Sequence, residues 1–393
     1  MRRSTNTRIE SIDLMKGLVM VIMALDHVRF FFHIETLGGD PTNLETTTTG
    51  LFLTRFITHF CAPTFVFLAG TSAYFYGRNK TKKQLSRFLW TRGLWLVFVE
   101  LVIMDLMWTF NPGFDLILFG VIWAIGVSMI VLAILVYLPL KWILAFGFIM
   151  VLGHNILDPV QVEGSGPLAW IWAMLHVQQP FVTGGRMFFF VYPLIPWIGV
   201  IGLGYGFGHL YAKDFDPLRR RKWLSGIGLA AVGLFIVLRA FNIYGNPEPW
   251  TGQKDTVFTL LSFIKVFKYP PSLQYLLLTL GPTIFILGQV ENFKNGFSRW
   301  LQVFGKVPFF FYILHIFLIH LLALGAMAWS GGNWQEMVLD MSSFTSEALA
   351  GYGYPLWTVY LIWLIVILIL YPVCKAYMKY KIGNRDKWWL SYL

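Results

Sequence analysis

Charged residues are scarce in this chain of 393 residues, since Asp, Glu, Lys and Arg together make up only 13% of it. A soluble globular domain usually carries about 25% charged residues, so a single water-soluble domain is excluded. Cysteine is also scarce, because the chain contains only Cys61 and Cys374. Their wide separation within apolar stretches gives no sign of a disulfide framework or a thiolate metal site. Fixed-period repeats and low-complexity segments are lacking too, which favours one domain over residues 1–393.

Long apolar runs are abundant, and 56% of the residues are hydrophobic. A helix needs about 20 apolar residues to cross a hydrocarbon core about 30 Å thick. Runs of that order lie at residues 13–34, 51–77, 88–110, 115–138, 141–157, 187–211, 224–243, 272–290, 301–326 and 355–377. The sequence therefore predicts an all-α fold, a polytopic integral membrane helical bundle of about ten transmembrane helices. The stretch 251–271 mixes charges with an apolar stripe, so we expect an interfacial or re-entrant helix there.

Lysine and arginine are distributed unevenly between alternate loops. The loops at 35–50, 159–185 and 327–354 contain none, whereas basic residues gather at 1–8, 78–92, 213–222, 294–299 and 379–387. Basic loops stay on the cytoplasmic side of a membrane, so both termini are expected to be cytoplasmic. The net charge of +11 is then a topology signal, and we expect no nucleic-acid partner.

Ionisable residues interrupt two of the apolar runs close to their outer ends. The first run contains Asp26, His27 and Arg29, and the second contains Arg55 and His59. A rise of 1.5 Å per residue puts both histidines about 10 Å below the outer face. Arg55 and His59 project from the same side of their helix because they are four residues apart. We therefore expect the two runs to contribute to one site.

The cost of charge in a membrane predicts how such side chains are arranged. Each charge at the centre of a helix costs about 2.5–3.5 kcal/mol on insertion scales. Five such charges facing lipid, on Asp26, Arg55, Glu100, Asp105 and Arg239, would together cost roughly 12–18 kcal/mol. That is as large as a typical free energy of unfolding. We therefore expect these groups to pair, to face the interior, or to line a wet cavity near the outer face.

Prolines within the apolar runs predict carbonyl groups without helical partners. Pro63 follows His59 by four residues and has no N–H, so the carbonyl of His59 lacks its usual donor. Pro193, Pro196 and Pro308 free other carbonyls in the same way. Such carbonyls need polar neighbours or water, which again indicates a polar interior.

The histidines have structural as well as functional interpretations. His27 beside Asp26 is compatible with catalysis or with a satisfied interhelical hydrogen bond. His59 with Arg55 is compatible with the same role or with structural pairing to an acid. His315, in the segment LHIFLIH, either touches a substrate or only joins helices. No two histidines lie three or four residues apart with carboxylates beside them, so we expect no metal site.

Four segments carry a family resemblance. RIESIDLMKGLVMVIMALDH, residues 8–27, resembles the first-helix signature of transmembrane acyltransferases. HFCAPTFVFLAGTSAYF, residues 59–75, resembles the second helix of the heparan-α-glucosaminide N-acetyltransferase catalytic-domain-like family. YPLIPWIGVIGLGYGFG, residues 192–208, and GKVPFFFYILHIFLIH, residues 305–320, are similar to later segments of that family and of related bacterial membrane proteins.

The resemblance implies a membrane-embedded acetyltransferase. It would move an acetyl group from cytosolic acetyl-CoA to an extracytoplasmic acceptor, either an amino sugar or a glycan hydroxyl. A histidine near the outer ends of the first two helices would be the general base: His27 fits the signature, and His59 and His33 are the alternatives. Asp26 would orient an imidazole, and Arg29 or Arg55 would stabilise the tetrahedral oxyanion.

Acetyl-CoA is therefore the expected acyl donor, and no metal is expected. Because the phosphates of the donor should stay near the basic inner face, we predict that Lys16, Lys268, Arg299 and Lys306 bind them. Membrane lipids and a small-molecule or glycan acceptor are the other expected partners, and a homodimer is compatible with the sequence. We expect the chain in the plasma (inner) membrane of a bacterium.

A different class of function stays open on the residues alone. Buried charges and broken helices are equally natural in a secondary transporter or carrier for a sugar or lipid-linked metabolite. A non-catalytic scaffold of the same fold is a third alternative.

Overall fold

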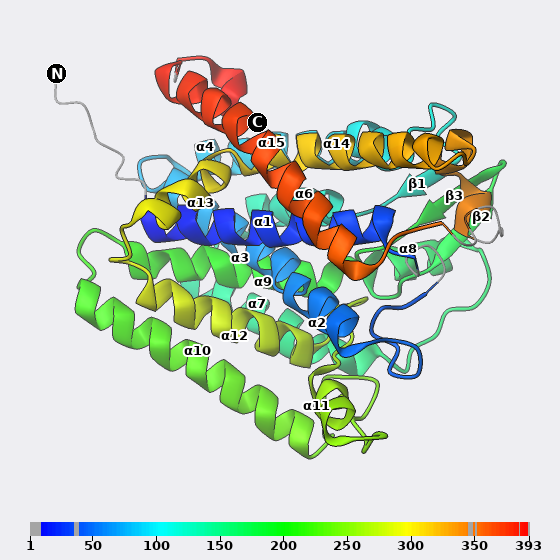
Figure 1. The fold of residues 1–393 in the computed structure, drawn as a ribbon. Coiled ribbons are helices and arrows are strands. Elements are labelled where there is room, and N and C mark those ends of the chain that lie inside the picture. Colours follow the sequence, from blue (N-terminus) through cyan, green and yellow to red (C-terminus); the bar gives the residue numbers. More distant parts are fainter. Residues whose placement is uncertain (1–8, 35–38, 345–348, 350–351, 385, 392–393) are drawn as a thin grey trace.

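Long helices run side by side through one body in the computed structural model of the chain (Figure 1). The structure describes residues 9–34, 39–344, 349, 352–384 and 386–391. The first helices are α1 (Glu10–Phe32), α2 (Thr49–Thr58), α3 (Cys61–Gly77), α4 (Lys82–Phe98) and α5 (Asp105–Thr109), with a π-helical segment (Val99–Met104) between the last two. Helices α6 (Val121–Leu135), α7 (Leu140–Gly153) and α8 (Pro167–Leu175) follow the first strand. The remaining helices are α9 (Leu194–Phe207), α10 (Pro217–Ala240), α11 (Thr256–Ile264), α12 (Leu273–Gln289), α13 (Gly296–Lys306), α14 (Pro308–Trp329) and α15 (Leu356–Gly383).

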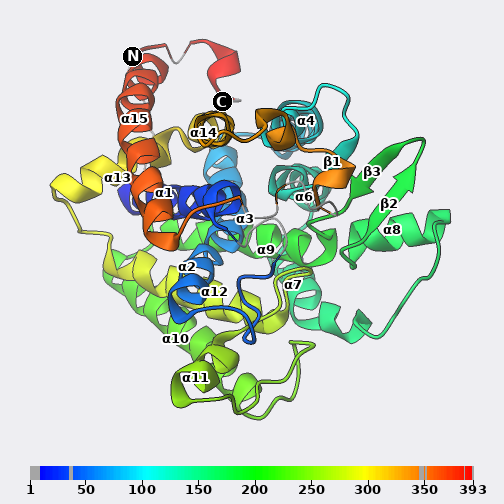
Figure 2. The same ribbon diagram turned by 45° about the vertical axis from the view of Figure 1, so that its right-hand side comes forward.

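Helix α1 lies at the centre of the bundle. It packs against α2, α3, α12, α13, α14 and α15, which surround it in Figure 2. Two neighbours donate to its backbone: Trp363 Nε1 donates to the Val21 carbonyl at 2.8 Å, and the Cys61 thiol donates to the Val19 carbonyl at 3.3 Å. A helix that is enclosed in this way can hold ionisable side chains away from lipid.

Glycine allows neighbouring helices to approach very closely. A Cβ atom on Gly70 of α3 would lie 2.1 Å from the Ile201 carbonyl oxygen of α9, and one on Gly204 of α9 would lie 2.0 Å from the Phe67 carbonyl oxygen. Helices α1 and α13 approach each other similarly at Gly305. Van der Waals packing of small residues is a main source of helix association in membranes, so these contacts fix the walls of the bundle interior.

A small sheet closes the end of the bundle that lies to the right in Figure 1. Its strands are β1 (Leu116–Leu118), β2 (Pro180–Thr183) and β3 (Arg186–Phe189), in the order β1-β3-β2. Strand β3 pairs in parallel with β1 and antiparallel with β2. Gly184 and Gly185 both have positive φ and form the two-residue turn of the β2–β3 hairpin, a geometry that glycine adopts without strain.

The chain is mostly helical, as predicted, and the sheet is a small addition that the prediction did not include. The predicted helical run 115–138 begins in β1, and the run 187–211 begins in β3. Apolar runs of this kind do not distinguish a short buried strand from the start of a buried helix. The run 301–326 is also divided, because α13 ends at Lys306 and Pro308 begins α14 at a position where a helix needs no N–H.

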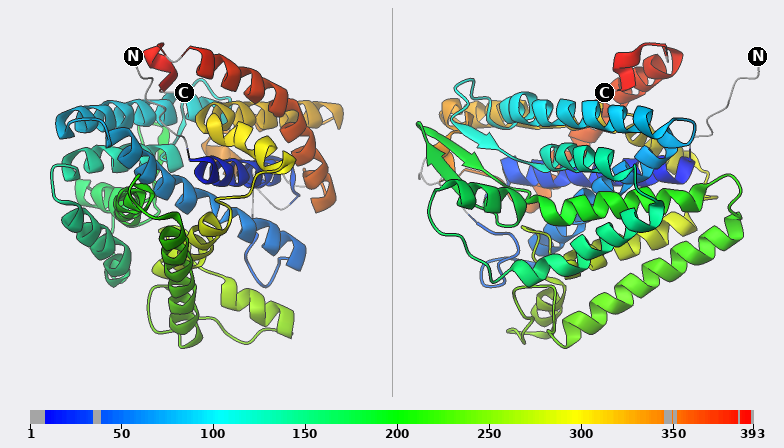
Figure 3. Two further views of the ribbon diagram at one scale, coloured as in Figure 1. Left: turned by 90° about the vertical axis from the view of Figure 1, so that its left-hand side faces the viewer. Right: turned by 180° about the vertical axis from the view of Figure 1, so that it is seen from behind.

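Six described segments are long and apolar enough to cross a membrane. They are Thr49–Gly77, Leu140–Leu157, Leu194–Tyr211, Pro217–Ala240, Pro308–Trp329 and Leu356–Gly383. Helices α6 and α12 are apolar but shorter, and Figure 3 shows α10 at the periphery beside α12. This is the pattern of a helical membrane protein. The count of about ten spans and the cytoplasmic position of both termini stay predictions, and the segment 251–271 does contain a short helix, α11.

The contact between α3 and α9 predicts a stability effect. Replacing Gly204 by Ala should lower the free energy of unfolding by about 1–3 kcal/mol, because the added methyl group meets a backbone carbonyl that cannot move away. Gly226→Ala in α10 is the matched control, since a Cβ atom there meets nothing within 4 Å. Thermal unfolding of the purified protein in detergent measures both variants. Equal melting temperatures for the two variants would contradict the packing described here.

Candidate active site

A cavity of about 540 Å³ lies beside the second half of α1. Its floor and walls come from α1, α2, α3, α5, α14 and the π-helical segment, and the sheet covers it. We call it the main cavity, and its lining residues are Met23, Asp26, His27, Arg29, Phe30, Arg55, Thr58, Cys61, Ala62, Phe65, Glu100, Trp108, Leu116, Leu118, Gly120, Val121, Pro180, Met187, Phe189, Val191, Tyr192, Lys268, Tyr269 and Tyr312. Most of these side chains are apolar, so the few polar ones determine what the cavity can do.

His27 is held by a second histidine. Nδ1 of His27 lies 2.7 Å from Nε2 of His315, and Nδ1 of His315 lies 2.9 Å from the carbonyl oxygen of Phe311. A carbonyl oxygen only accepts, so Nδ1 of His315 carries its proton, and Nε2 of the neutral ring accepts a hydrogen bond from His27. Nε2 of His27 then has a lone pair that accepts no hydrogen bond from the residues that the structure describes. Trp108 packs against the His27 ring in a T-shaped arrangement, with 4.9 Å between the centroids, and further restricts its orientation.

Asp26 binds two arginines from different helices. Its Oδ1 accepts hydrogen bonds from Nε and Nη2 of Arg29 at 3.2 and 2.9 Å, and its Oδ2 accepts one from Nη1 of Arg55. The single carboxylate therefore ties the end of α1 to α2. Asp26 and Arg55 pair inside the bundle, which is one of the arrangements that the cost of charge in lipid predicts. Within the part of the chain that the structure describes, Asp26 makes no hydrogen bond with the ring nitrogens of His27, whose orientation comes from His315 instead.

Glu100 and Asp105 bind backbone groups. Oε2 of Glu100 accepts hydrogen bonds from the backbone N–H groups of Ile122 and Trp123 at 2.9 and 3.2 Å, at the start of α6. Oδ1 of Asp105 accepts one from the N–H of Leu118 at 3.1 Å. Both acids therefore face the interior, as the cost of charge in lipid predicts. Glu100 lies in the π-helical segment and lines the main cavity, and such segments are frequent at functional sites.

A second, smaller cavity of about 270 Å³ adjoins the first. We call it the outer cavity, and it is lined by Asp40, Thr42, Arg55, His59, Gln178, Glu248, Lys265, Val266, Phe267, Lys268 and Tyr269. Arg55, Lys268 and Tyr269 line both cavities and form their boundary. The two predicted histidines thus lie on neighbouring cavities: His27 lines the main one, and His59 lines the outer one.

The carbonyl of His59, which lacks its helical donor because of Pro63, accepts a hydrogen bond from another helix. The hydroxyl of Tyr275 in α12 donates to the carbonyl oxygen of His59 at 2.8 Å, as the proline pattern predicts. The Nδ1 atom of His59 is buried and has no hydrogen-bond partner among the described residues. His33 ends α1 and forms a backbone bridge to Tyr354, and it does not line either cavity.

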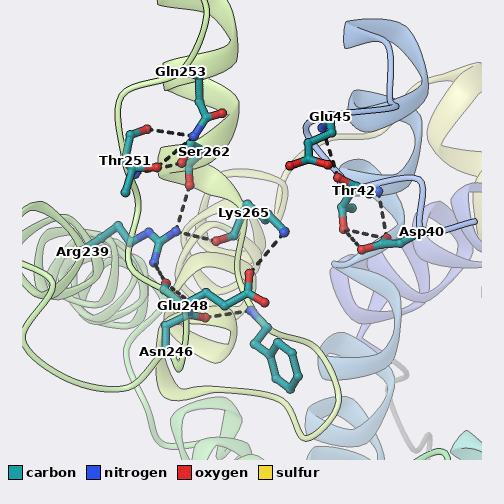
Figure 4. A network of polar contacts seen from close by, with 12 residues as sticks. Asp40, Thr42, Glu45, Arg239, Asn246, Glu248, Thr251, Gln253, Ser262 and Lys265 are labelled. Carbon is teal, nitrogen blue, oxygen red and sulfur yellow. Dashed lines mark hydrogen bonds and ion pairs between the residues drawn. The ribbon is translucent and has the colours of Figure 1, made fainter.

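Arg239 holds in place the chain segment around α11 that lines part of the outer cavity. Its guanidinium donates to the carbonyl oxygens of Phe263, Glu248, Ser262 and Lys265 at 2.7–2.9 Å. Figure 4 shows Arg239 with Glu248, Ser262 and Lys265, beside the ion pair of Lys265 with Glu248. The charge of Arg239 was predicted to avoid lipid, and here backbone carbonyl oxygens bind it inside the protein. Arg239 therefore positions the chain on both sides of α11.

The four basic residues predicted to bind phosphates do not lie together. Lys16 is on the first half of α1, where its Nζ donates to Ser72 at 2.7 Å, and Arg299 and Lys306 belong to α13, which packs against that half. Lys268 is at the boundary of the two cavities, beyond the opposite half of α1. Lys268 lies apart from the other three because the loop between α11 and α12 lies beside Asp26 and Arg55. The spacing of residues in the sequence does not reveal this position of the loop.

Sequence reasoning did not identify three features of this site. It left the contact between His27 and His315 open, because residues 288 positions apart give no local signal. It assigned no role to Tyr192 and Tyr269 of the main cavity, and it did not foresee the covering sheet. The glycine pair at 184–185 was the available signal for the sheet. No cluster of metal-ligating side chains occurs in the part of the chain that the structure describes.

Comparison with known proteins identifies the family. Residues 8–246 match the family model described as heparan-alpha-glucosaminide N-acetyltransferase, catalytic. A search of curated proteins finds no match. The family match covers more than half of the chain and includes Asp26, His27, Arg55 and His59. The chain therefore belongs to the heparan-alpha-glucosaminide N-acetyltransferase catalytic family, a family of membrane acetyltransferases.

Proposed function

We propose that the protein transfers an acetyl group from cytosolic acetyl-CoA to an amine or hydroxyl group of an extracytoplasmic acceptor, with His27 as the general base. The observation that carries the proposal is the hydrogen-bond chain from the Phe311 carbonyl through His315 to His27. This chain leaves Nε2 of His27 as a proton acceptor on a residue that lines the main cavity. A correctly oriented base of this kind typically contributes about 10²- to 10⁴-fold to the rate.

The proposed reaction is a direct acyl transfer. Nε2 of His27 takes the proton from the acceptor as its nitrogen or oxygen attacks the thioester carbonyl carbon. The carbonyl oxygen becomes the oxyanion of a tetrahedral intermediate. When the C–S bond breaks, the acetyl group stays on the acceptor, and the proton on His27 passes to the leaving thiolate of CoA. His27 is therefore positively charged only between these two proton transfers. No metal takes part in the proposed steps.

Arg29 and Arg55 are the proposed oxyanion stabilisers. Asp26 holds both guanidinium groups in place, and both line the main cavity. Fixed positive groups in a site with little water stabilise developing negative charge strongly. We therefore assign to Asp26 the positioning of the arginines, and to His315 the orientation of the base.

The donor is proposed to reach the cavity along α1. Lys16, Arg299 and Lys306 remain the proposed partners of the CoA phosphates, since all three belong to α1 or to α13 packed beside it. Lys16 and Asp26 are ten residues apart, so the rise of a helix separates them by about 15 Å. An extended pantetheine arm is long enough to span this distance, and the apolar walls of the main cavity suit an acetyl thioester.

A transporter remains the competing function, and one experiment separates the two. Purified protein is incubated with radiolabelled acetyl-CoA and a panel of amino sugars and glycans, and acetylated products are counted. Product formation supports the acetyltransferase. Stabilisation of the protein by a sugar, together with no product from any acceptor and no stabilisation by acetyl-CoA, would support a carrier instead.

Replacement of His27 and replacement of His59 should affect kcat differently, because the two residues line different cavities. His27→Ala should lower kcat by about 10²- to 10⁴-fold, because the base is lost. His59→Ala should leave kcat within about threefold of the wild type, a change of less than 1 kcal/mol. The acetyl transfer assay measures both, and thermal unfolding checks that both proteins are folded. Full activity of His27→Ala with loss of activity in His59→Ala would move the proposed base to the outer cavity.

His315 is a positioning residue, and its variants test that role. His315→Leu should lower kcat with little change in the KM for acetyl-CoA, because the ring of His27 loses the acceptor that orients it. His315→Gln keeps an acceptor oxygen, so it should retain more activity than His315→Leu. Equal loss in both variants, or a change confined to KM, would contradict the proposed orientation.

The proposed phosphate contacts predict an effect on donor binding. Combined replacement of Lys16, Arg299 and Lys306 by Ala should weaken CoA binding at least about tenfold, since charge-assisted hydrogen bonds contribute about 1.5–3 kcal/mol each. Titration calorimetry with CoA measures the change. Binding of CoA with unchanged affinity would refute the assignment.

A further inference from the structure

Lys268 is a buried cation that has no carboxylate partner among the residues that the structure describes. Its residue surface is only 9% exposed, and no described carboxylate lies within ion-pair distance of its Nζ atom. Its Nζ atom instead interacts with the side chain of Tyr269, whose ring centroid is 5.1 Å away. Buried lysines are rare in folded proteins unless they are paired, so this side chain requires an explanation.

Each carboxylate that lines the two cavities is already engaged. Asp26 binds Arg29 and Arg55, and Glu248 pairs with Lys265 at 3.1 Å. Glu100 accepts N–H groups at the start of α6, and Asp40 accepts the hydroxyl and N–H of Thr42. These interactions leave Lys268, at the boundary of the cavities, without a carboxylate within ion-pair distance among the described residues.

The neighbouring phenol responds to this positive charge. Tyr269 lies in the loop between α11 and α12. Burial acts to raise the pKa of its phenol, but the positive charges of Lys268 and Arg55 outweigh burial and lower that pKa to about 8. A negative group placed at the boundary would therefore be attracted by the same field.

We infer that the acetyl acceptor carries an anionic group, a phosphate or a carboxylate, which binds Lys268 at the boundary of the two cavities. This inference rests on the proposed acetyl transfer. An acceptor bound in this way has its anionic group at the boundary and its nucleophilic amine or hydroxyl in the main cavity beside His27. Lys268 lies outside residues 8–246, which match the family model.

The CoA phosphates are the other anions that Lys268 could bind. They fit this position less well, because the polar boundary adjoins the outer cavity, whereas Lys16 and α13 lie beside the opposite half of α1. The outer cavity is also lined by loop residues such as Asp40, Gln178 and Glu248, whose polar groups suit a hydroxylated acceptor. The experiment must nevertheless distinguish the two sources.

Matched probes test the inference by binding, independently of turnover. Glucosamine is compared with glucosamine 6-phosphate and with muramic acid, which adds a carboxylate, and coenzyme A is titrated separately. The proteins are wild type, Lys268→Met and Lys268→Arg, and Lys265→Met is the control because Lys265 lines the same cavity but has a partner in Glu248. Ligand-dependent thermal unfolding gives each apparent Kd and also shows whether each variant is folded.

We expect the wild type to bind at least one anionic amino sugar about ten- to a hundred-fold more tightly than glucosamine. Lys268→Met should lose this preference, whereas Lys268→Arg and Lys265→Met should keep it. Equal binding of the three sugars by the wild type, or an unchanged preference in Lys268→Met, would overturn the inference. Loss of coenzyme A binding in Lys268→Met, without any preference for anionic sugars, would also overturn it by assigning the lysine to the donor.

The same preparations separate this inference from the proposed function. Selective binding of an anionic amino sugar with no acetyl transfer to any acceptor would leave the anion site in place and remove the proposed reaction. Acetyl transfer to neutral and anionic sugars with equal kcat/KM would leave the proposed reaction in place and remove the anion site.

Discussion

The central constraint on this molecule is that an ionised side chain in an apolar helical bundle must have a partner that does not require bulk water. Asp26 satisfies this constraint for two arginines at once, because Arg29 and Arg55 bind its two carboxylate oxygens. The triad joins α1 to α2 and places two guanidinium groups on the wall of the main cavity. The site thus arises from the same requirement that keeps charge out of lipid.

Backbone groups provide the partners that side chains do not. Glu100 accepts the N–H groups that begin α6, and Arg239 donates to four carbonyl oxygens around α11. The hydroxyl of Tyr275 satisfies the carbonyl that Pro63 leaves free. These interactions hold the loops and broken helices around both cavities, since irregular backbone at membrane depth is stable only where it is satisfied by protein or water. Among the described cavity residues, Lys268 interacts with the phenol of Tyr269 but with no carboxylate within ion-pair distance, which is why we infer an anionic ligand there.

The sequence predicted those parts of the structure that follow from composition and local spacing. Apolar runs predicted the helical membrane fold, and the charges of Asp26 and Arg55 predicted an interior polar site. The sequence could not predict that Lys268 lies at that site, because the position of Lys268 depends on the path of a loop that Arg239 fixes. Nor could it decide between His27 and His59, whose calculated depths are equal. Only the contact with His315, formed by packing of α1 against α14, distinguishes the two rings.

The tautomer of His27 tests the central claim most directly. Nitrogen NMR of the purified protein labelled with ¹⁵N-histidine reports which ring nitrogen carries the proton, and the signal is assigned by its loss in His27→Ala. The account predicts that His27 of the ligand-free protein is in the Nδ1–H form, with a free lone pair on Nε2, and that His315→Leu removes this preference. Observation of His27 in the Nε2–H form in the wild-type protein would contradict it.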